Sequence, residues 1–190
     1  MSYRGSDLNL QQRSSDAPSD VGQGGPNGAH SPLPQEGPTI DVDETVLASC
    51  NHAYDAASLH GSPEVRLFHL LHALTRIPAA AEVLERRGIR AEHLRREMAM
   101  AMAAEEPHLN GDAPRTSLEL AEVLYHAAEQ ASLRHGSASV DDVLKTVIAG
   151  DRDSPAATLL MRAAADPEQF QRWREDLRRQ TLHAEPSPAP

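Results

Sequence analysis

The sequence has a single cysteine, Cys50, among its 190 residues. One cysteine cannot form an intrachain disulfide, so a disulfide-stapled scaffold is excluded and a reducing compartment is favoured. Long apolar runs are also missing, because no stretch approaches the about 18 consecutive apolar residues that span a membrane. The opening residues, MSYRGSDLNLQQ, lack the apolar core of a signal peptide. We therefore expect a cytoplasmic protein without membrane contact.

Basic residues are scarce: 18 lysines and arginines face 28 acidic residues, which gives a formal net charge of −10. A protein that binds nucleic acid through the phosphate backbone needs a basic footprint, so we expect no nucleic-acid partner. The sequence also lacks the Gly-x-x-x-x-Gly-Lys-Ser/Thr loop that cradles nucleotide phosphates. ATP hydrolysis by this chain is therefore not expected.

Large apolar side chains are rare at both ends of the chain. Residues 1–41 are rich in glycine, proline and serine, and residues 183–190 have a similar composition. Such segments cannot bury enough apolar area to offset the entropy of ordering the chain. We predict a disordered arm over 1–41, an ordered domain over 42–182 and a disordered tail over 183–190.

The first half of the predicted domain shows helical signals and no convincing strand alternation. Asp43 can cap a helix, and Ser62-Pro63-Glu64 combines a serine cap, a proline at the first helical position and an acid near the positive dipole end. Gly88 can take the left-handed conformation that ends a helix. The predicted helices run from Asp43 to about Leu59, from Ser62 to Pro78, over 79–87 and over 91–105.

The second half begins after the linker-like residues 107–115 and repeats this scheme. Thr116 and Glu119 have the spacing of a capping box. Ser139 can cap the next helix, and Ser154-Pro155 repeats the serine–proline start. Asp166-Pro167-Glu168 then opens the last helix, so four more helices are predicted.

Phrases also recur between the halves. ASLHGSPEV (57–65) returns as ASLRHGSASV (131–140), HLLHAL parallels DVLKTVI, and VLERRGIRAEHL parallels LLMRAAADPEQF. Repeats of this size indicate a duplicated structural unit. Repeat 1 should cover about 43–106 and repeat 2 about 116–182, with Gly61 and Gly136 turning the chain at equivalent places.

The order of these signals resembles the Clp repeat, which occurs twice in the N-terminal domain of Clp-type AAA+ unfoldases. The best matches are EVRLFHLLHAL (64–74) and VLERRGI (83–89), while the second copy is more diverged. The resemblance implies an all-α fold in which two tandem four-helix repeats form one compact pseudo-two-fold domain. It further implies a domain that docks adaptors and substrates and has no ATPase activity. Whether the chain is closest to the type VI secretion branch of these proteins stays open.

From this resemblance we expect a non-enzymatic protein-binding module of ATP-dependent proteolysis or protein quality control, with no cofactor. Its partners would be proteins or peptides: a Clp unfoldase or peptidase, an adaptor or a substrate. The chain itself would be a monomer or a weak homodimer. An apolar residue off the leucine stripe could line a groove between the halves, and a dense arginine patch could receive an acidic partner. The candidate contact residues are Phe68, His72, Arg86, Arg87 and Arg90.

Alternative functions rest on weaker signals. A small helical enzyme could use Cys50, but His52 lies two residues away on the same helix and points to a different side. His69 and His72 could begin a metal site, yet no complete ligand pattern accompanies them; a histidine that bonds across the helix packing is the simpler interpretation. Met98, Met100 and Met102 favour core filling over a promiscuous surface. A helical transcriptional or stress regulator is disfavoured by the acidic charge.

Overall fold

The computed structural model describes residues 9–11, 39–104, 113–150 and 154–183. The disorder predicted for the remainder of 1–41 and for 184–190 falls outside these described residues. Within them the chain forms eight helices and four strands of two or three residues. The helices are α1 (Glu44–His60), α2 (Leu67–Leu74), α3 (Pro78–Arg86), α4 (Ala91–Ala103), α5 (Leu118–Ser132), α6 (Val140–Ala149), α7 (Pro155–Ala163) and α8 (Pro167–His183). The strands are β1 (Asn9–Gln11), β2 (Thr39–Asp41), β3 (Glu64–Val65) and β4 (Arg115–Thr116).

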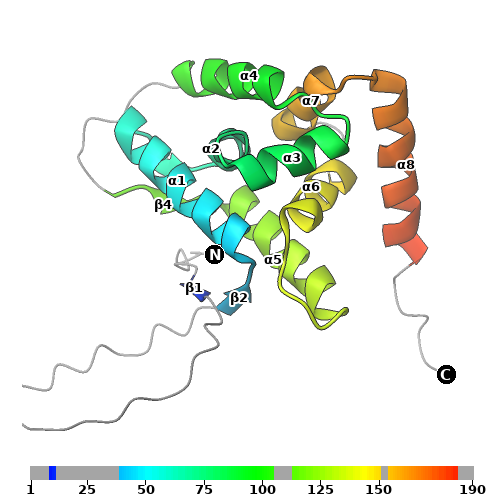
Figure 1. Ribbon diagram of the computed structural model, residues 1–190. Coiled ribbons are helices and arrows are strands. Elements are labelled where there is room, and N and C mark those ends of the chain that lie inside the picture. The colour runs from blue at the N-terminus through cyan, green and yellow to red at the C-terminus, as the bar shows by residue number, and fades with distance from the viewer. Residues whose placement is uncertain (1–8, 12–38, 105–112, 151–153, 184–190) are drawn as a thin grey trace, which may run out of the picture.

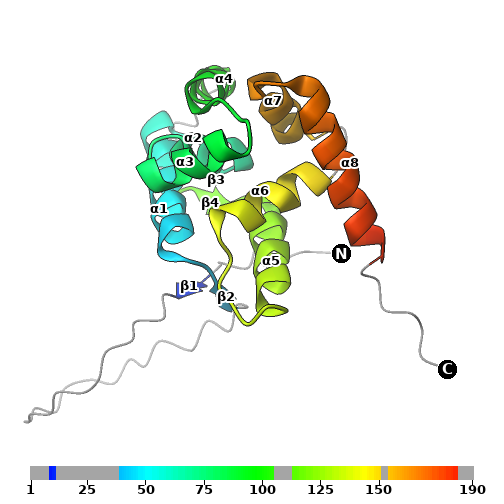
Figure 2. The ribbon, with the colours of Figure 1, turned by 45° about the vertical axis from the view of Figure 1, so that its right-hand side comes forward.

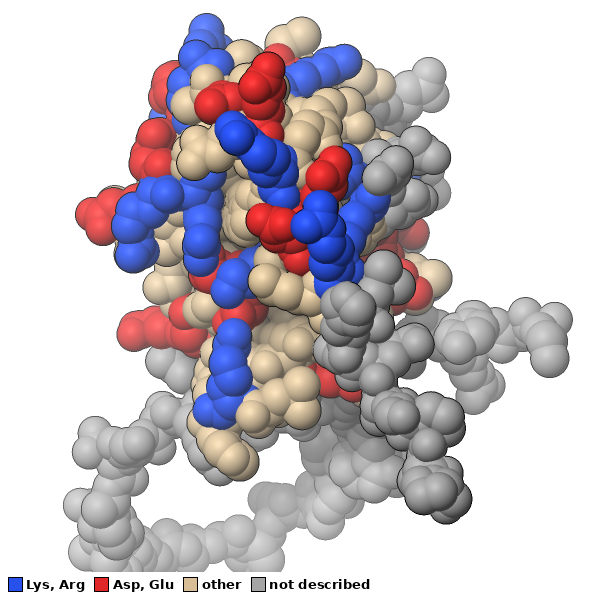
Figure 3. Space-filling view, turned by 90° about the vertical axis from the view of Figure 1, so that its right-hand side faces the viewer, with Lys and Arg blue, Asp and Glu red and all other residues tan. Residues whose placement is uncertain are grey.

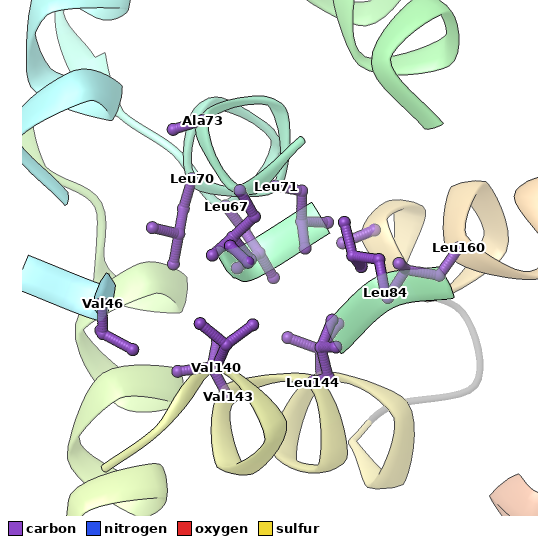
Figure 4. Close-up of a cluster of buried hydrophobic side chains, with 14 of the residues drawn as sticks. Val46, Leu67, Leu70, Leu71, Ala73, Leu84, Val140, Val143, Leu144 and Leu160 are labelled. Atoms are coloured by element: carbon purple, nitrogen blue, oxygen red, sulfur yellow. The ribbon is translucent and has the colours of Figure 1, made fainter. Parts of the chain in front are cut away.

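The fold is all-α and consists of two successive four-helix repeats, as the sequence predicted (Figure 1). Helices α1 to α4 form repeat 1, and α5 to α8 form repeat 2. The apolar centre lies where α2 and α6, the second helix of each repeat, face each other. Figure 4 shows Leu67, Leu70 and Leu71 of α2 pointing toward Val140, Val143 and Leu144 of α6. All six side chains are buried, so sequence-equivalent residues of the two repeats build one shared core.

Three predicted helix caps, Asp43, Ser139 and Asp166, each accept a hydrogen bond from an amide in the first turn of their helix. Asp43 Oδ1 accepts from the amide of Val46 at 2.7 Å, and Asp166 Oδ1 accepts from the amide of Glu168 at 2.9 Å. The predicted capping box at Thr116 is wrong by one residue. Ser117 is the cap, since Thr116 belongs to β4 and its neighbour accepts from the amide of Leu120 at 3.3 Å.

The predicted helix start at Ser62 is also wrong. Residues Glu64–Val65 form β3, which pairs in parallel with β4, and α2 begins only at Leu67. The amides of Arg115 and Ser117 donate to the carbonyls of Pro63 and Val65, each at 3.0 Å. The backbone partner of β3 lies about fifty residues away, and this pairing overrides the local serine–proline signal. No local sequence pattern reveals such a distant partner.

A related pairing joins the segments that lead into α1 and α6. Val42 and Ala138 form a parallel bridge, in which the amide of Asp43 donates to the Ala138 carbonyl at 2.9 Å and the amide of Ala138 donates to the Asp41 carbonyl at 3.0 Å. This bridge and the β3–β4 pair correspond to each other under the pseudo-two-fold symmetry. Each joins the segment before the first helix of one repeat to the segment before the second helix of the other. Together they tie the two repeats at equivalent places.

Strand β2 continues from this bridge and pairs in parallel with β1. Both strands fall inside the segment predicted to be disordered, so that prediction does not hold for residues 9–11 and 39–41. The physical reason is non-local: β2 packs on α5, and Ile40 is only 2% exposed in the shared core. Composition alone cannot show that contact.

The loops after α3 and α7 also meet. Ile89 and Ala164 form an antiparallel bridge, with the amide of Arg90 donating to Ala163 at 2.9 Å and the amide of Ala165 donating to Gly88 at 2.7 Å. Gly88 has a φ of 73°, as its predicted helix-ending role requires. The bridge brings α4 next to α7 at the far end of the molecule from β1 and β2 (Figure 2).

The two equivalent turns after α1 and α5 differ from expectation in one position. Gly61 has a φ of 66° and caps α1, as predicted. In repeat 2 the left-handed residue is His135, with a φ of 56°, and Gly136 lacks a positive φ. Of the three methionines in α4, Met98 and Met102 fill the core as expected, whereas Met100 is 70% exposed.

Candidate partner-binding surface

A cleft of about 630 Å³ lies at the junction of the two repeats and is called the inter-repeat cleft. Repeat 1 contributes the start of α1 and the outer face of α3, and repeat 2 contributes the start of α6. The Val42–Ala138 bridge holds the starts of α1 and α6 side by side, and so fixes two walls of the cleft. Its lining residues are Asp43, Thr45, Ala79, Glu82, Val83, Arg86, Arg87, Ser139, Val140 and Asp141.

Arg87 and Asp141 join the repeats across this cleft. The guanidinium donates two hydrogen bonds to the carboxylate, Nε to Oδ1 at 2.5 Å and Nη2 to Oδ2 at 2.7 Å. The same guanidinium lies 5.3 Å from the ring centroid of Trp173 in α8, within cation–π range. Lys145 approaches the other side of the pair, 2.8 Å from Asp141. Arg87 is therefore held in place by the protein itself.

The titration of this pair follows from its contacts. The hydrogen bond to Asp141 raises the pKa of Arg87 above its usual value. Burial acts to raise the pKa of Asp141, but hydrogen bonds from Arg87 and Lys145 outweigh it and hold that pKa below its usual value. Both groups stay charged at neutral pH, so the link between the repeats persists there.

Arg86 has a different environment from its neighbour. Its side chain is exposed at the rim of the inter-repeat cleft, and its Nε donates to the carbonyl of Glu82 at 3.3 Å. The adjacent acids of the cleft, Glu82 and Asp43, lie on α3 and at the start of α1. The cleft thus presents both charge signs, with Arg86 as its outward-facing cation.

The other three predicted contact residues lie elsewhere. Arg90 caps α4 and donates to the carbonyl of Ala164 at 3.3 Å, so it supports the contact between the two loops. Phe68 packs half-buried against the core, with its ring centroid 4.4 Å from that of His69. His72 is half-buried on the same helix, and its pKa is lowered by burial and then by nearby Arg76 and other cations. The structure therefore brings together only Arg86 and Arg87 of the five.

Sequence reasoning missed the partners of these arginines in the cleft. Asp43 and Ser139 were identified only as helix caps, of the first helix of repeat 1 and the second helix of repeat 2. The signal that they meet is the pairing of Val42 with Ala138, which depends on backbone contacts between the repeats. Asp141 gave no separate signal, because an acid in the first turn of a helix is common.

Repeat 2 carries a second hollow of about 510 Å³ between α5, α6 and α8. Its charged members include Arg134 and Asp142, which form an ion pair at 2.7 Å, and Leu177 of α8 contributes apolar surface. Figure 3 shows the face that carries α8, where basic and acidic side chains are interleaved. The described part of this face has no continuous basic stripe of the kind that follows a nucleic-acid backbone.

The residues considered for catalysis or metal binding have structural surroundings. His69 is fully buried, its Nδ1 accepts from the amide of Arg66 at 3.0 Å, and its Nε2 lies 3.4 Å from Ser62 Oγ. Burial, then the nearby His60 and Arg66, lower its pKa to about 4. Burial raises the pKa of the Cys50 thiol to about 12. In the described parts of the chain, no group of three or more His, Cys, Asp or Glu residues is placed to hold a metal ion.

Comparison with known families places this architecture. Residues 42–163 match the Clp repeat (R) N-terminal domain family, which is more than half of the chain. The chain belongs to this family. The Clp repeat match includes the start of α1, the α2–α6 core and the whole inter-repeat cleft. No curated protein matches the sequence.

Several solved structures share the Clp repeat fold. The Hsp104 N-terminal domain from Candida albicans is 14% identical, with a TM-score of 0.58, and the match covers 73% of this chain and 91% of that one. A structure from work on a malarial protein secretion system is 17% identical, with a TM-score of 0.56 and coverages of 76% and 97%. A structure from work on the ATPase ClpV, the TssB-TssC sheath and the HsiE protein of type VI secretion is 16% identical, with a TM-score of 0.52 and coverages of 78% and 91%. At these identities the likeness establishes a shared fold.

No helix in the described residues is both long and apolar enough to cross a membrane.

Proposed function

We propose that this chain is a non-enzymatic Clp-repeat domain that binds protein or peptide segments in the cytoplasm and serves ATP-dependent proteolysis or protein quality control. Its partners are a Clp-type unfoldase or peptidase, an adaptor or a substrate, and the chain acts as a monomer or weak homodimer. The observation that supports this proposal best is the inter-repeat cleft, which both repeats build and which carries an outward-facing arginine.

The chemistry of the cleft suits a polypeptide. Val83 and Val140 supply apolar surface, while Glu82, Arg86 and Asp43 line the same opening with charges of both signs. Concave sites with an apolar base and a few polar groups are the usual form of a binding pocket. Arg86 is the group that would meet a carboxylate or a main-chain carbonyl of the bound segment, because Arg87 is already engaged by Asp141.

The surroundings of the reactive residues support a binding role over catalysis. A nucleophilic cysteine needs a lowered pKa and an adjacent base, whereas burial raises the pKa of Cys50. A general base needs a pKa near the working pH, whereas His69 has a pKa of about 4 and its Nδ1 is occupied by a backbone amide. Both residues serve the packing of repeat 1.

The test measures binding of the full chain to fluorescein-labelled casein, a polypeptide without a stable fold, by fluorescence anisotropy. We expect Arg86→Glu to weaken binding at least about fivefold, which corresponds to one lost charge-assisted contact. Arg172→Glu is the matched control, because Arg172 is exposed on α8 outside the inter-repeat cleft. Equal binding by wild type and Arg86→Glu, or an equal loss in both variants, would contradict the cleft as the binding site.

A second measurement addresses the proposed role. The chain is added to a Clp unfoldase and peptidase of the same host, and degradation of the labelled casein is followed with time. We expect the chain to change the degradation rate in a concentration-dependent way, and Arg86→Glu to reduce that effect. Light scattering over the same concentrations reports whether the chain stays monomeric.

A further inference from the structure

Strands β1 and β2 pair with each other outside residues 42–163, the part of the chain that matches the Clp repeat family. The function of this pair is therefore not given by the family match. Strand β2 is the segment that leads into α1, and β4 is the corresponding segment that leads into α5. Val42, directly after β2, bridges to Ala138 just before α6, and β4 pairs with β3 just before α2. Only β2 has a further strand on it, since among the described residues β4 pairs with β3 alone. Within the described part of the chain, repeat 2 thus has no counterpart of β1.

The geometry of β2 defines which of its edges β1 covers. Asp41 and Asp43 direct their backbone groups toward Ala138, as the two hydrogen bonds of that bridge show. Neighbouring residues of a strand direct their backbone groups to opposite sides, so Ile40 presents its amide and carbonyl to the other edge. Strand β1 lies along that edge, with Leu10 opposite Ile40 (Figures 1 and 2).

From these relations we infer that the outer edge of β2 is a docking site for an extended polypeptide segment, which adds to it as a parallel strand, and that residues 9–11 occupy this edge within the same chain. This inference rests on the proposed function and deepens it, because it names the form in which a partner binds.

Two properties of the edge favour an extended polypeptide as the partner. Strand addition is held by main-chain hydrogen bonds, which every non-proline residue can make, so it tolerates many sequences. A substrate or adaptor recognised while unfolded offers such a backbone. The edge is also firmly positioned, because Ile40 is buried against the core and the opposite edge of β2 is bonded to Ala138.

The strand that now covers the edge can be exchanged. It is three residues long and runs parallel to β2, and short two-stranded parallel pairs are only marginally stable. Because residues 9–11 belong to the same chain, their pairing with β2 is intramolecular and competes with a free peptide. A free peptide should therefore bind weakly to the wild-type chain and more tightly when β1 cannot pair.

The test uses the full chain and a fluorescein-labelled peptide with the sequence of residues 7–13, DLNLQQR. Leu10→Pro/Gln11→Pro removes two consecutive amide donors from β1. Ser14→Pro/Ser15→Pro is the control, with the same two prolines placed beyond β1. We expect the first variant to bind the peptide at least about tenfold more tightly than wild type, and the control to bind it like wild type. A peptide that carries the same Leu10→Pro and Gln11→Pro changes should not bind to any of the three proteins.

Hydrogen exchange of the Ile40 amide gives a second, independent measurement. We expect exchange to accelerate at least about tenfold in Leu10→Pro/Gln11→Pro and to slow again when the DLNLQQR peptide is added. Equal peptide binding by all three proteins, binding of the proline-containing peptide, or unchanged exchange at Ile40 would overturn the inference. Exchange of residues 9–11 between two copies, seen as a dimer that the proline variant abolishes, would overturn the assignment of β1 to its own chain.

The outcomes separate this inference from the proposed function. If the proline variant gains peptide binding but neither protein binds casein, the docking edge stands and the proposed function fails. If casein binding responds to Arg86→Glu while the peptide assays show no effect of the β1 prolines, the proposed function stands and the docking edge fails.

Discussion

His69 and Asp142 have the same role in the two repeats. Each occupies the third position of the second helix and accepts a hydrogen bond from the amide of the capping residue, Arg66 to His69 Nδ1 and Ser139 to Asp142 Oδ2, both at 3.0 Å. A side chain at this position that reaches back to the cap satisfies an amide that the helix leaves without a partner. The duplicated unit therefore keeps the cap while exchanging a carboxylate for an imidazole.

This exchange predicts a pH dependence of stability. The imidazole must be neutral to accept from Arg66, and its pKa is lowered from 6.5 to about 4 in the folded chain. The unfolded chain binds the proton more readily, so the contribution is fully present above about pH 6.5 and is lost as the pH falls toward 4. We expect the free energy of unfolding, measured by urea denaturation, to fall by up to about 3 kcal/mol across this window.

His69→Asn isolates that contribution, because asparagine keeps an acceptor at the third position and does not titrate. The variant should lose stability at pH 7 through poorer packing with Phe68, and should show a flatter pH profile between 6.5 and 4. His126→Asn, on the exposed side of α5, is the control and should keep the wild-type slope. An unchanged slope in His69→Asn would show that other groups cause the dependence.

The turns after α1 and α5 predict that glycine has opposite effects on the free energy of unfolding when it is introduced in one turn and removed from the other. His135 holds a φ of 56° where Gly61 of repeat 1 has 66°, and a residue with a Cβ pays about 1–2 kcal/mol for this conformation. Glycine loses about 0.5–1 kcal/mol through its freedom in the unfolded chain. We therefore expect His135→Gly to raise the free energy of unfolding by about 0.5 kcal/mol and Gly61→Ala to lower it by about 1 kcal/mol. Thermal and urea denaturation check both; a loss of stability in His135→Gly would show that its side chain makes a favourable contact.

The helices and their caps were predictable because their signals are local. Asp43, Ser139 and Asp166 each precede an apolar stripe at the helical period, and each caps a helix in the structure. The duplication also predicted which helices correspond. The helices and the duplication could therefore be predicted from local signals, whereas the pseudo-two-fold arrangement was implied by the resemblance to the Clp repeat.

The short strands and the inter-repeat cleft could not be predicted, because they depend on contacts between residues that are distant in sequence. Val65 and Ala138 each pair with a backbone segment of the other repeat. A serine–proline pair can precede either a helix or a strand, so it does not distinguish the two. Arg87 looked like part of a surface patch, and only the folded chain shows its carboxylate partner 54 residues away. Contacts between residues that are distant in sequence decide the site, and they leave no periodic signal.

The link between Arg87 and Asp141 predicts a measurable coupling. Its two hydrogen bonds have favourable geometry, but the side chains are 39% and 25% exposed, so solvent screening reduces its strength. A double-mutant cycle with Arg87→Ala and Asp141→Ala should give a coupling of about 1 kcal/mol in the free energy of unfolding. Because the pKa of Asp141 is lowered, the coupling should persist above about pH 4 and disappear as the pH falls below it.

An exposed pair on α8 provides the comparison for this cycle. Arg179 and Glu175 are four residues apart, 3.6 Å from each other and more than half exposed. The same cycle there should give a coupling near zero in moderate salt. Equal couplings for the two pairs would mean that the bridge between the repeats adds nothing beyond an ordinary surface contact.

The thiol of Cys50 provides the test of the enzymatic alternative. Burial raises its pKa to about 12, whereas a reactive thiol has a lowered pKa and access to solvent. We expect the native chain to react with a chromogenic disulfide reagent at least about a hundredfold more slowly than the urea-unfolded chain, because so little thiolate is present. The matched control is Ser58→Cys in a Cys50→Ala background, which places the thiol on the exposed face of the same helix and should react rapidly. If native Cys50 reacted as fast as this control, the thiol would be accessible and ionised, and a nucleophilic role would have to be reconsidered.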